Sequence, residues 1–168
     1  MLTKNEFELR DIVSLSGGSV DYFKLNNLVF LIQELANPFT RPWQFEWKYG
    51  IRSFDVQTSI RIAKHFGLLE DCTKLENGYR IEHVKIKDSN EPTALMENEQ
   101  LQELVPYLCN QDAKLLDVAS CILWLKKEGL IGQEINSKLN DFKGHLKDLF
   151  DEAFKLVEKD RKIMVEYN

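Results

Sequence analysis

The stretch Phe45 to Ser53, FEWKYGIRS, marks the point at which the hydrophobic period of this 168-residue chain changes. Aromatic residues alternate with polar ones before Gly50, as expected for a strand with one buried face; they are Trp43, Phe45, Trp47 and Tyr49. From Ser53, a good N-cap, the spacing is helical until Gly67. Gly50 would permit a tight exit from the strand. The corner is either the lead-in to a recognition helix at 53–66 or an ordinary strand-turn-helix connection.

Two helices are predicted before this corner. Thr3 and Glu6 form a capping-box pattern, and the helix that they begin ends before Gly17 and Gly18. The segment KLNNLVFLIQELANP, residues 24–38, has apolar residues at helical spacing and closes with Asn37 and Pro38. This second helix has the strongest helical pattern in the first half of the chain.

A β-hairpin follows the corner. Two extended runs in residues 72–87 flank Asn77 and Gly78, the dipeptide that most readily forms a tight hairpin turn. We expect the strand at 43–49 to join this hairpin as a third strand. The order helix, helix, strand, helix, hairpin is that of a winged-helix domain, a helix-turn-helix variant whose hairpin is the wing.

The rest of the chain is predicted to be helical. After a polar break at 88–92, helical patterns cover 95–108, 113–127 and one long segment at 134–161. The long helix carries a continuous apolar stripe, which favours core packing over the alternative, a coiled-coil homodimer. We therefore predict a mainly α protein with a small β-sheet, comprising a winged-helix-like domain at 1–90 and a C-terminal helical bundle at 91–168.

Composition favours a folded protein in the cytoplasm. Apolar residues make up 43% and charged residues 29% of the chain, and the sequence has no apolar run of about 18 residues that could span a membrane. The net charge of −5 argues against a strongly basic nucleic-acid binder. Residues 41–90, however, hold nine basic and seven acidic side chains, so this middle part leans basic.

The predicted helix at 53–66 has one stripe suited to reading DNA. Residues advance by about 100° along a helix, so polar and basic side chains lie opposite the apolar set. Arg and Gln are suited to base edges, and Lys and Thr to the DNA backbone. The candidate DNA-binding residues are Gln57, Thr58, Arg61, Lys64 and His65 in the helix, with Arg80 and Lys85 in the wing.

Four segments, KLNNLVFLIQE, FEWKYGIRS, FGLLED and NGYRI, resemble the bacterial and archaeal proteins related to YwgA and to the Panacea domain of SocA-like antitoxins. The resemblance covers about residues 20–86. The matching positions are Lys24, Leu25, Leu28, Val29, Leu31, Tyr49, Gly50, Ser53, Gly67, Leu68 and Leu69. Ile51 and Arg52 stand where that family usually has Pro-Tyr. The resemblance implies a winged-helix-like regulatory or antitoxin-type protein.

Signatures of nucleotide-binding enzymes, zinc proteases and hydrolases are missing from the sequence. We therefore expect no enzymatic activity, no cofactor and no metal. Two functions stay open: a transcription regulator that binds double-stranded DNA through 53–66 and the wing, and an antitoxin-like or adaptor module that binds a protein partner. A homodimer is compatible with both.

Overall fold

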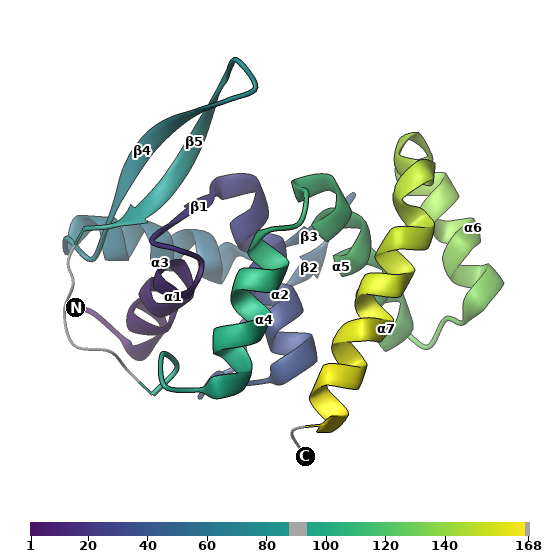
Figure 1. The fold of residues 1–168 in the computed structure, drawn as a ribbon, viewed down its shortest axis with the longest axis horizontal. Coiled ribbons are helices and arrows are strands. Elements are labelled where there is room, and N and C mark those ends of the chain that lie inside the picture. Colours follow the sequence, from purple (N-terminus) through teal and green to yellow (C-terminus); the bar gives the residue numbers. More distant parts are fainter. Residues whose placement is uncertain (88–93, 167–168) are drawn as a thin grey trace.

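The computed structural model of the chain describes residues 1–87 and 94–166. Its first part has the order of a winged-helix domain (Figure 1). The elements are α1 (Lys4–Leu15), β1 (Ser19–Asp21), α2 (Tyr22–Ala36), β2 (Glu46–Trp47), β3 (Ile51–Arg52), α3 (Phe54–His65), β4 (Leu69–Glu76) and β5 (Tyr79–Ile86). The predicted capping box is present at α1, where the backbone N–H of Thr3 donates to the Glu6 carboxylate at 2.6 Å.

The three-stranded antiparallel sheet has the order β1-β5-β4. Its third strand is β1, and our prediction that residues 43–49 would fill this place is wrong. Val20 of β1 lies opposite Val84 of β5, and both are almost fully buried. The buried contact between Val20 and Val84 therefore stabilises the segment after Gly18 as a strand. The sequence analysis assigned no secondary structure to this segment.

The stretch at 43–52 forms a hairpin of its own, in which β2 pairs with β3. Tyr49 has φ 58° and Gly50 has φ 155°, so the chain reverses there instead of continuing as a strand. The predicted one-sided aromatic face is also wrong for Tyr49, which is exposed, whereas Trp43 is buried. Phe45 and Trp47 do pack inward, against Phe30 and Trp124 respectively.

The C-terminal part consists of α4 (Glu99–Cys109), α5 (Ala113–Lys127), α6 (Gly132–Lys143), the 3₁₀ turn η1 (Gly144–Leu149) and α7 (Phe150–Glu166). The predicted single helix at 134–161 is thus broken at Gly144. Leu146 has non-helical angles, φ −110° and ψ 18°. The break lets Leu139 and Phe150 both be buried, since α7 turns back alongside α6 and packs on α5 (Figure 1). The predicted polar break at 88–92 and the domain boundary at 90 lie outside the described residues.

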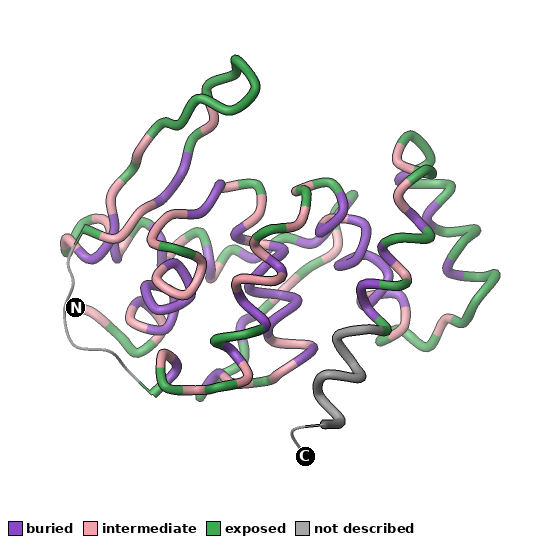
Figure 2. The backbone as a smooth tube through the Cα atoms, in the orientation of Figure 1, coloured by how far each residue is buried: buried purple, intermediate pink, exposed green. Residues whose placement is uncertain are grey.

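Buried apolar side chains form one continuous core that extends from Leu9 in α1 to Val157 in α7. Helix α2 is central to it, because α2 packs against α4 and α5 and Phe30 is fully buried. Figure 2 shows that burial is concentrated in the helices, whereas the tip of the β4-β5 hairpin is exposed. The fold is mainly α with a small β-sheet, as predicted. Within the described residues, no helix combines the length and apolarity needed to cross a bilayer.

Candidate functional site

Helix α3 is anchored to the body of the protein on one face. Val56 and Ala63 are buried, and the Ser53 side chain caps the helix by accepting from the Val56 N–H at 3.2 Å. Ser59 donates to the buried carboxylate of Glu6 in α1 at 2.7 Å. Burial alone would raise the pKa of Glu6, but hydrogen bonds from Thr3 and Ser59 outweigh it and lower that pKa. The opposite face of α3 is left to solvent.

This free face carries three of the predicted DNA-binding residues. Gln57, Arg61 and His65 are all exposed and lie one helical turn apart. Within the described parts of the chain, Arg61 makes neither a hydrogen bond nor an ion pair. Thr58 is half-buried and its hydroxyl is covered. The structure thus brings Gln57, Arg61 and His65 together and leaves Thr58 beneath them.

Lys64, also a candidate DNA-binding residue, makes contacts within the protein. Its ammonium lies 2.7 Å from Asp71 of β4 and donates to the Tyr22 hydroxyl at 3.2 Å. The hydrogen bond with Asp71 is the main reason why the pKa of Lys64 is raised, and the same bond lowers the pKa of Asp71. The Tyr22 hydroxyl also donates to Asp71. Lys64 therefore ties α3 to the base of the wing and to α2.

The two predicted DNA-binding residues of the wing differ in their partners, and the tip of the wing is apolar. Arg80 is exposed opposite Leu75, whereas Lys85 pairs with Glu70 at 2.8 Å. That contact, through its hydrogen bond, raises the pKa of Lys85 and lowers the pKa of Glu70. At the tip, Leu75 and Tyr79 are 75% and 74% exposed. Lys85 is thus less available to a phosphate than Arg80.

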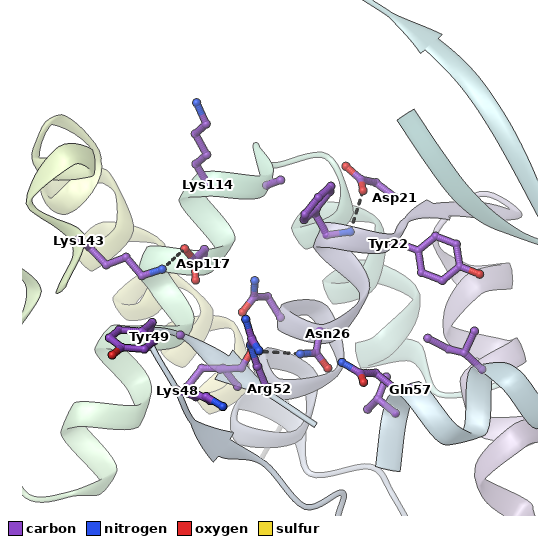
Figure 3. A pocket seen from close by; sticks show the side chains of 17 residues that line it. Asp21, Tyr22, Asn26, Lys48, Tyr49, Arg52, Gln57, Lys114, Asp117 and Lys143 are labelled. Atoms are coloured by element: carbon purple, nitrogen blue, oxygen red, sulfur yellow. Dashed lines mark hydrogen bonds and ion pairs between the residues drawn. The ribbon is translucent and has the colours of Figure 1, made fainter. Parts of the chain in front are cut away.

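A cleft of about 870 Å³ lies beside the N-terminal half of α3. Its walls come from the start of α2, the β2-β3 hairpin, α3 and the start of α5 (Figure 3). Three exposed cations line it: Lys48 and Arg52 from the hairpin and Lys114 from α5. Over the described residues, the side chains of these three cations have no acidic partner. Gln57 belongs to both this cleft and the free face of α3.

A partly buried ion pair supports the hairpin wall of the cleft. The Lys143 ammonium lies 2.6 Å from Asp117, and Lys143 is only 9% exposed (Figure 3). A Cβ atom on Gly50 would stand 3.4 Å from both charged groups. The hairpin turn therefore rests directly on the ion pair, in a backbone conformation that favours glycine.

Amide groups and aromatic rings complete the cleft. Asn26 donates to the Ile51 carbonyl at 3.1 Å and thereby joins α2 to the hairpin. Asn27 is 7% exposed, and its side-chain oxygen, like that of Asn26, is buried without a hydrogen-bond donor among the described residues. Phe23 and Tyr49 also line the cleft and are 81% and 73% exposed. These exposed rings leave apolar surface open to a ligand.

Sequence reasoning missed the cleft residues as a group. Lys48 and Arg52 stand in the quoted stretch FEWKYGIRS, and the basic excess of residues 41–90 was a signal for them. Asn27 and Lys114 gave no such signal, because their proximity depends on α2 packing against α5. No group of three His, Cys, Asp or Glu side chains suited to a metal ion occurs in the part of the chain that the structure describes.

The comparisons with known proteins add no assignment. No protein-family model, no curated protein and no solved structure matches the chain. Two adjoining surfaces of the protein are therefore the candidate sites. One is the free face of α3 together with the wing, and the other is the basic cleft.

Proposed function

We propose that this protein is a winged-helix regulator that binds double-stranded DNA through α3 and the β4-β5 wing. The observation that carries the proposal is the free face of α3, on which Gln57, Arg61 and His65 stand in one row and are exposed, with no described element packed over them. In winged-helix and other helix-turn-helix proteins, the recognition helix places such a face in the major groove.

The chemistry of this face suits base readout. Arg forms bidentate hydrogen bonds with guanine, and Gln does so with adenine. Arg61 is unpaired within the described chain, so binding would not require an existing ion pair to break. Arg80 would contact phosphate from the projecting wing (Figure 1). Lys64 and Lys85, by contrast, act mainly in holding the wing, since each has an acidic partner.

Overall charge limits the non-specific part of this binding. The chain has a net charge of −5, so long-range attraction to phosphates is weak. Affinity would depend on contacts made by α3, and a homodimer would add a second half-site at a fixed spacing. The proposal accordingly favours a specific operator over general DNA coating.

The test is fluorescence anisotropy with a random-sequence duplex and with the DNA upstream of the protein's own gene, each at two salt concentrations. Arg61→Ala should weaken binding about tenfold or more and lower the salt dependence. Lys138→Ala is the matched control, because it removes the same charge from an exposed site on α6. Absence of salt-dependent binding to both duplexes, or equal losses in the two variants, would contradict the proposal.

A second candidate function is binding of a protein partner through the wing tip. It is favoured by Leu75 and Tyr79, two apolar side chains that project into solvent on one hairpin. Under this alternative, a companion protein should co-purify stoichiometrically with the native protein and be lost from Leu75→Ser. Recovery of the native protein alone would count against it.

A further inference from the structure

We propose that the cleft between α2, α5 and the β2-β3 hairpin binds a free nucleotide, with the base on the α2 wall and the phosphate at the hairpin. This goes beyond DNA binding by α3 and does not depend on it. The cleft's size supports the proposal, because about 870 Å³ lies within the usual range for small-molecule sites, roughly 300–1,000 Å³.

Two hydrogen-bond acceptors on the α2 wall have no donor, and a ligand in the cleft could supply one to each. The side-chain oxygens of Asn26 and Asn27 are both buried, and neither accepts a hydrogen bond within the described residues. A buried acceptor without a partner is costly, so such a group in a cleft indicates a missing donor. The amino group of a nucleobase carries two N–H donors and matches two neighbouring amide oxygens.

Aromatic side chains at the same cleft favour a flat ligand. Phe23 and Tyr49 both line it with most of their surface exposed to solvent. A nucleobase can stack on such a ring, and this stacking stabilises binding. A sugar phosphate or an inorganic anion would leave this surface unused, whereas a nucleobase would cover it.

Charge decides where the phosphate lies. Of the two carboxylates in the lining, Asp117 pairs with Lys143, whereas Asp21 caps α2 by accepting from the Phe23 N–H at 2.8 Å and keeps its negative charge. The cations Lys48, Arg52 and Lys114 have no acidic partner among the described residues, so a phosphate would bind near them. Lys48 and Arg52 come from one hairpin, away from the Asp21 carboxylate (Figure 3). Arg can hold phosphate through two parallel hydrogen bonds, so Arg52 is the expected main contact.

The test is isothermal titration calorimetry of the full chain, without DNA, against adenosine, guanosine, cytidine and uridine monophosphates. The nucleoside that matches each nucleotide and inorganic phosphate serve as the two halves of the ligand. We expect at least one nucleotide to bind about tenfold or more tightly than either half, since base and phosphate contacts act together.

Two variants separate the parts of the site. Asn27→Leu fills the same space with an apolar group, so it should leave stability unchanged or higher but weaken nucleotide binding about tenfold. Arg52→Gln should reduce the affinity for the nucleotide to near that of the nucleoside, whereas Lys138→Gln should have no effect.

The proposal is overturned if none of the four nucleotides binds, if inorganic phosphate binds as tightly as every nucleotide, or if Asn27→Leu binds like the native protein. Because the titration contains no DNA, its failure leaves the α3 proposal untouched. Failure of the anisotropy experiment likewise leaves the cleft proposal standing.

Discussion

The two hairpins of this protein turn in similar ways but are held by different forces. The β4-β5 wing reverses at Asn77 and Gly78, with φ 51° and 82°, and its tip is surrounded by solvent. The β2-β3 hairpin reverses at Tyr49 and Gly50, with φ 58° and 155°. Its turn, unlike that of the wing, lies against the partly buried ion pair of Asp117 and Lys143.

Contacts with distant helices hold the β2-β3 hairpin in place. Trp47 packs on Trp124 at a ring-centroid distance of 6.4 Å and on Phe142 at 5.9 Å. Asn26 of α2 donates to the Ile51 carbonyl. The outer part of the wing instead depends on its own strand pairing, and its base is held by pairing with β1 and by the clamp of Lys64 and Asp71. The β4-β5 wing can project into solvent because residues within the hairpin specify its turn. The β2-β3 hairpin must stay in contact with the helices because those contacts hold its turn in place.

The largest expected effect is that of Gly50→Ala. A non-glycine residue at φ 155° is strained, by about 1–3 kcal/mol, and the ion pair beneath prevents the turn from moving to relieve the strain. We expect the free energy of unfolding in urea to fall by about 2 kcal/mol with an unchanged m-value. Tryptophan fluorescence, to which Trp47 of this hairpin contributes together with Trp43 and Trp124, should report the same transition. A fall below about 0.5 kcal/mol, the size of an ordinary surface substitution, would contradict the tertiary anchoring of this hairpin.

A smaller effect is expected for Gly78→Ala at the tip of the wing. Its φ of 82° also disfavours a side chain, but no atom stands within 4 Å of the added Cβ. We expect a loss of about 1 kcal/mol, since a left-handed L-residue costs about 1–2 kcal/mol and the free tip can adjust. Urea unfolding of both variants, measured side by side, shows which of them loses more stability. An equal or larger loss in Gly78→Ala would reverse the comparison.

The smallest effect concerns the clamp at the base of the wing. Because the Lys64 hydrogen bond lowers the pKa of Asp71 in the folded protein, the stability that this carboxylate contributes is present above its unfolded pKa and is lost as the pH falls through the folded pKa. The pKa of Lys64 is raised, so its contribution is lost only as the pH rises through its folded pKa. The clamp is complete near pH 7.

Asp71→Asn should therefore reduce stability at pH 7 by about 0.5 kcal/mol, as expected for a partly exposed ion pair. The difference from the native protein should be smaller at pH 3, which lies below the ordinary Asp pKa of 3.8, so that the stability from the lowered pKa of Asp71 is already being lost there. It should also shrink in 1 M salt. Urea unfolding at the two pH values measures it. A difference that stays the same at pH 3 would mean that charge has no part in the clamp.

Several elements were predictable because their signals are local. Thr3 with Glu6 specified the start of α1, Ser53 capped α3, and Asn77 with Gly78 specified the wing turn. Helical periodicity also predicted that Gln57 and Arg61 share an exposed stripe with His65 beside it, whereas Lys64, predicted on the same stripe, is half-buried. Each of these features depends on interactions between residues only a few positions apart. The sequence of a short segment is therefore enough to predict its conformation.

The remaining features depend on contacts between distant residues. Val20 pairs in the sheet because Val84 is opposite it, and the helix predicted at 134–161 breaks at Gly144 because both halves bury apolar side chains against the body. The basic cleft exists because α2, α5 and the β2-β3 hairpin meet, and only then do Arg52, Lys114 and Asn27 face one space.

The sequence by itself thus determined the mainly α, winged-helix character of the protein and the residues on the free face of α3, through periodicity, capping and one turn dipeptide. Tertiary structure alone decided the third strand, the reversal at Gly50, the pairing of Lys64 and Lys85 with acids, and the cleft. The physical reason is that burial and ion pairing join residues far apart in the chain, and their energies exceed the weak local preferences of the segments that they join.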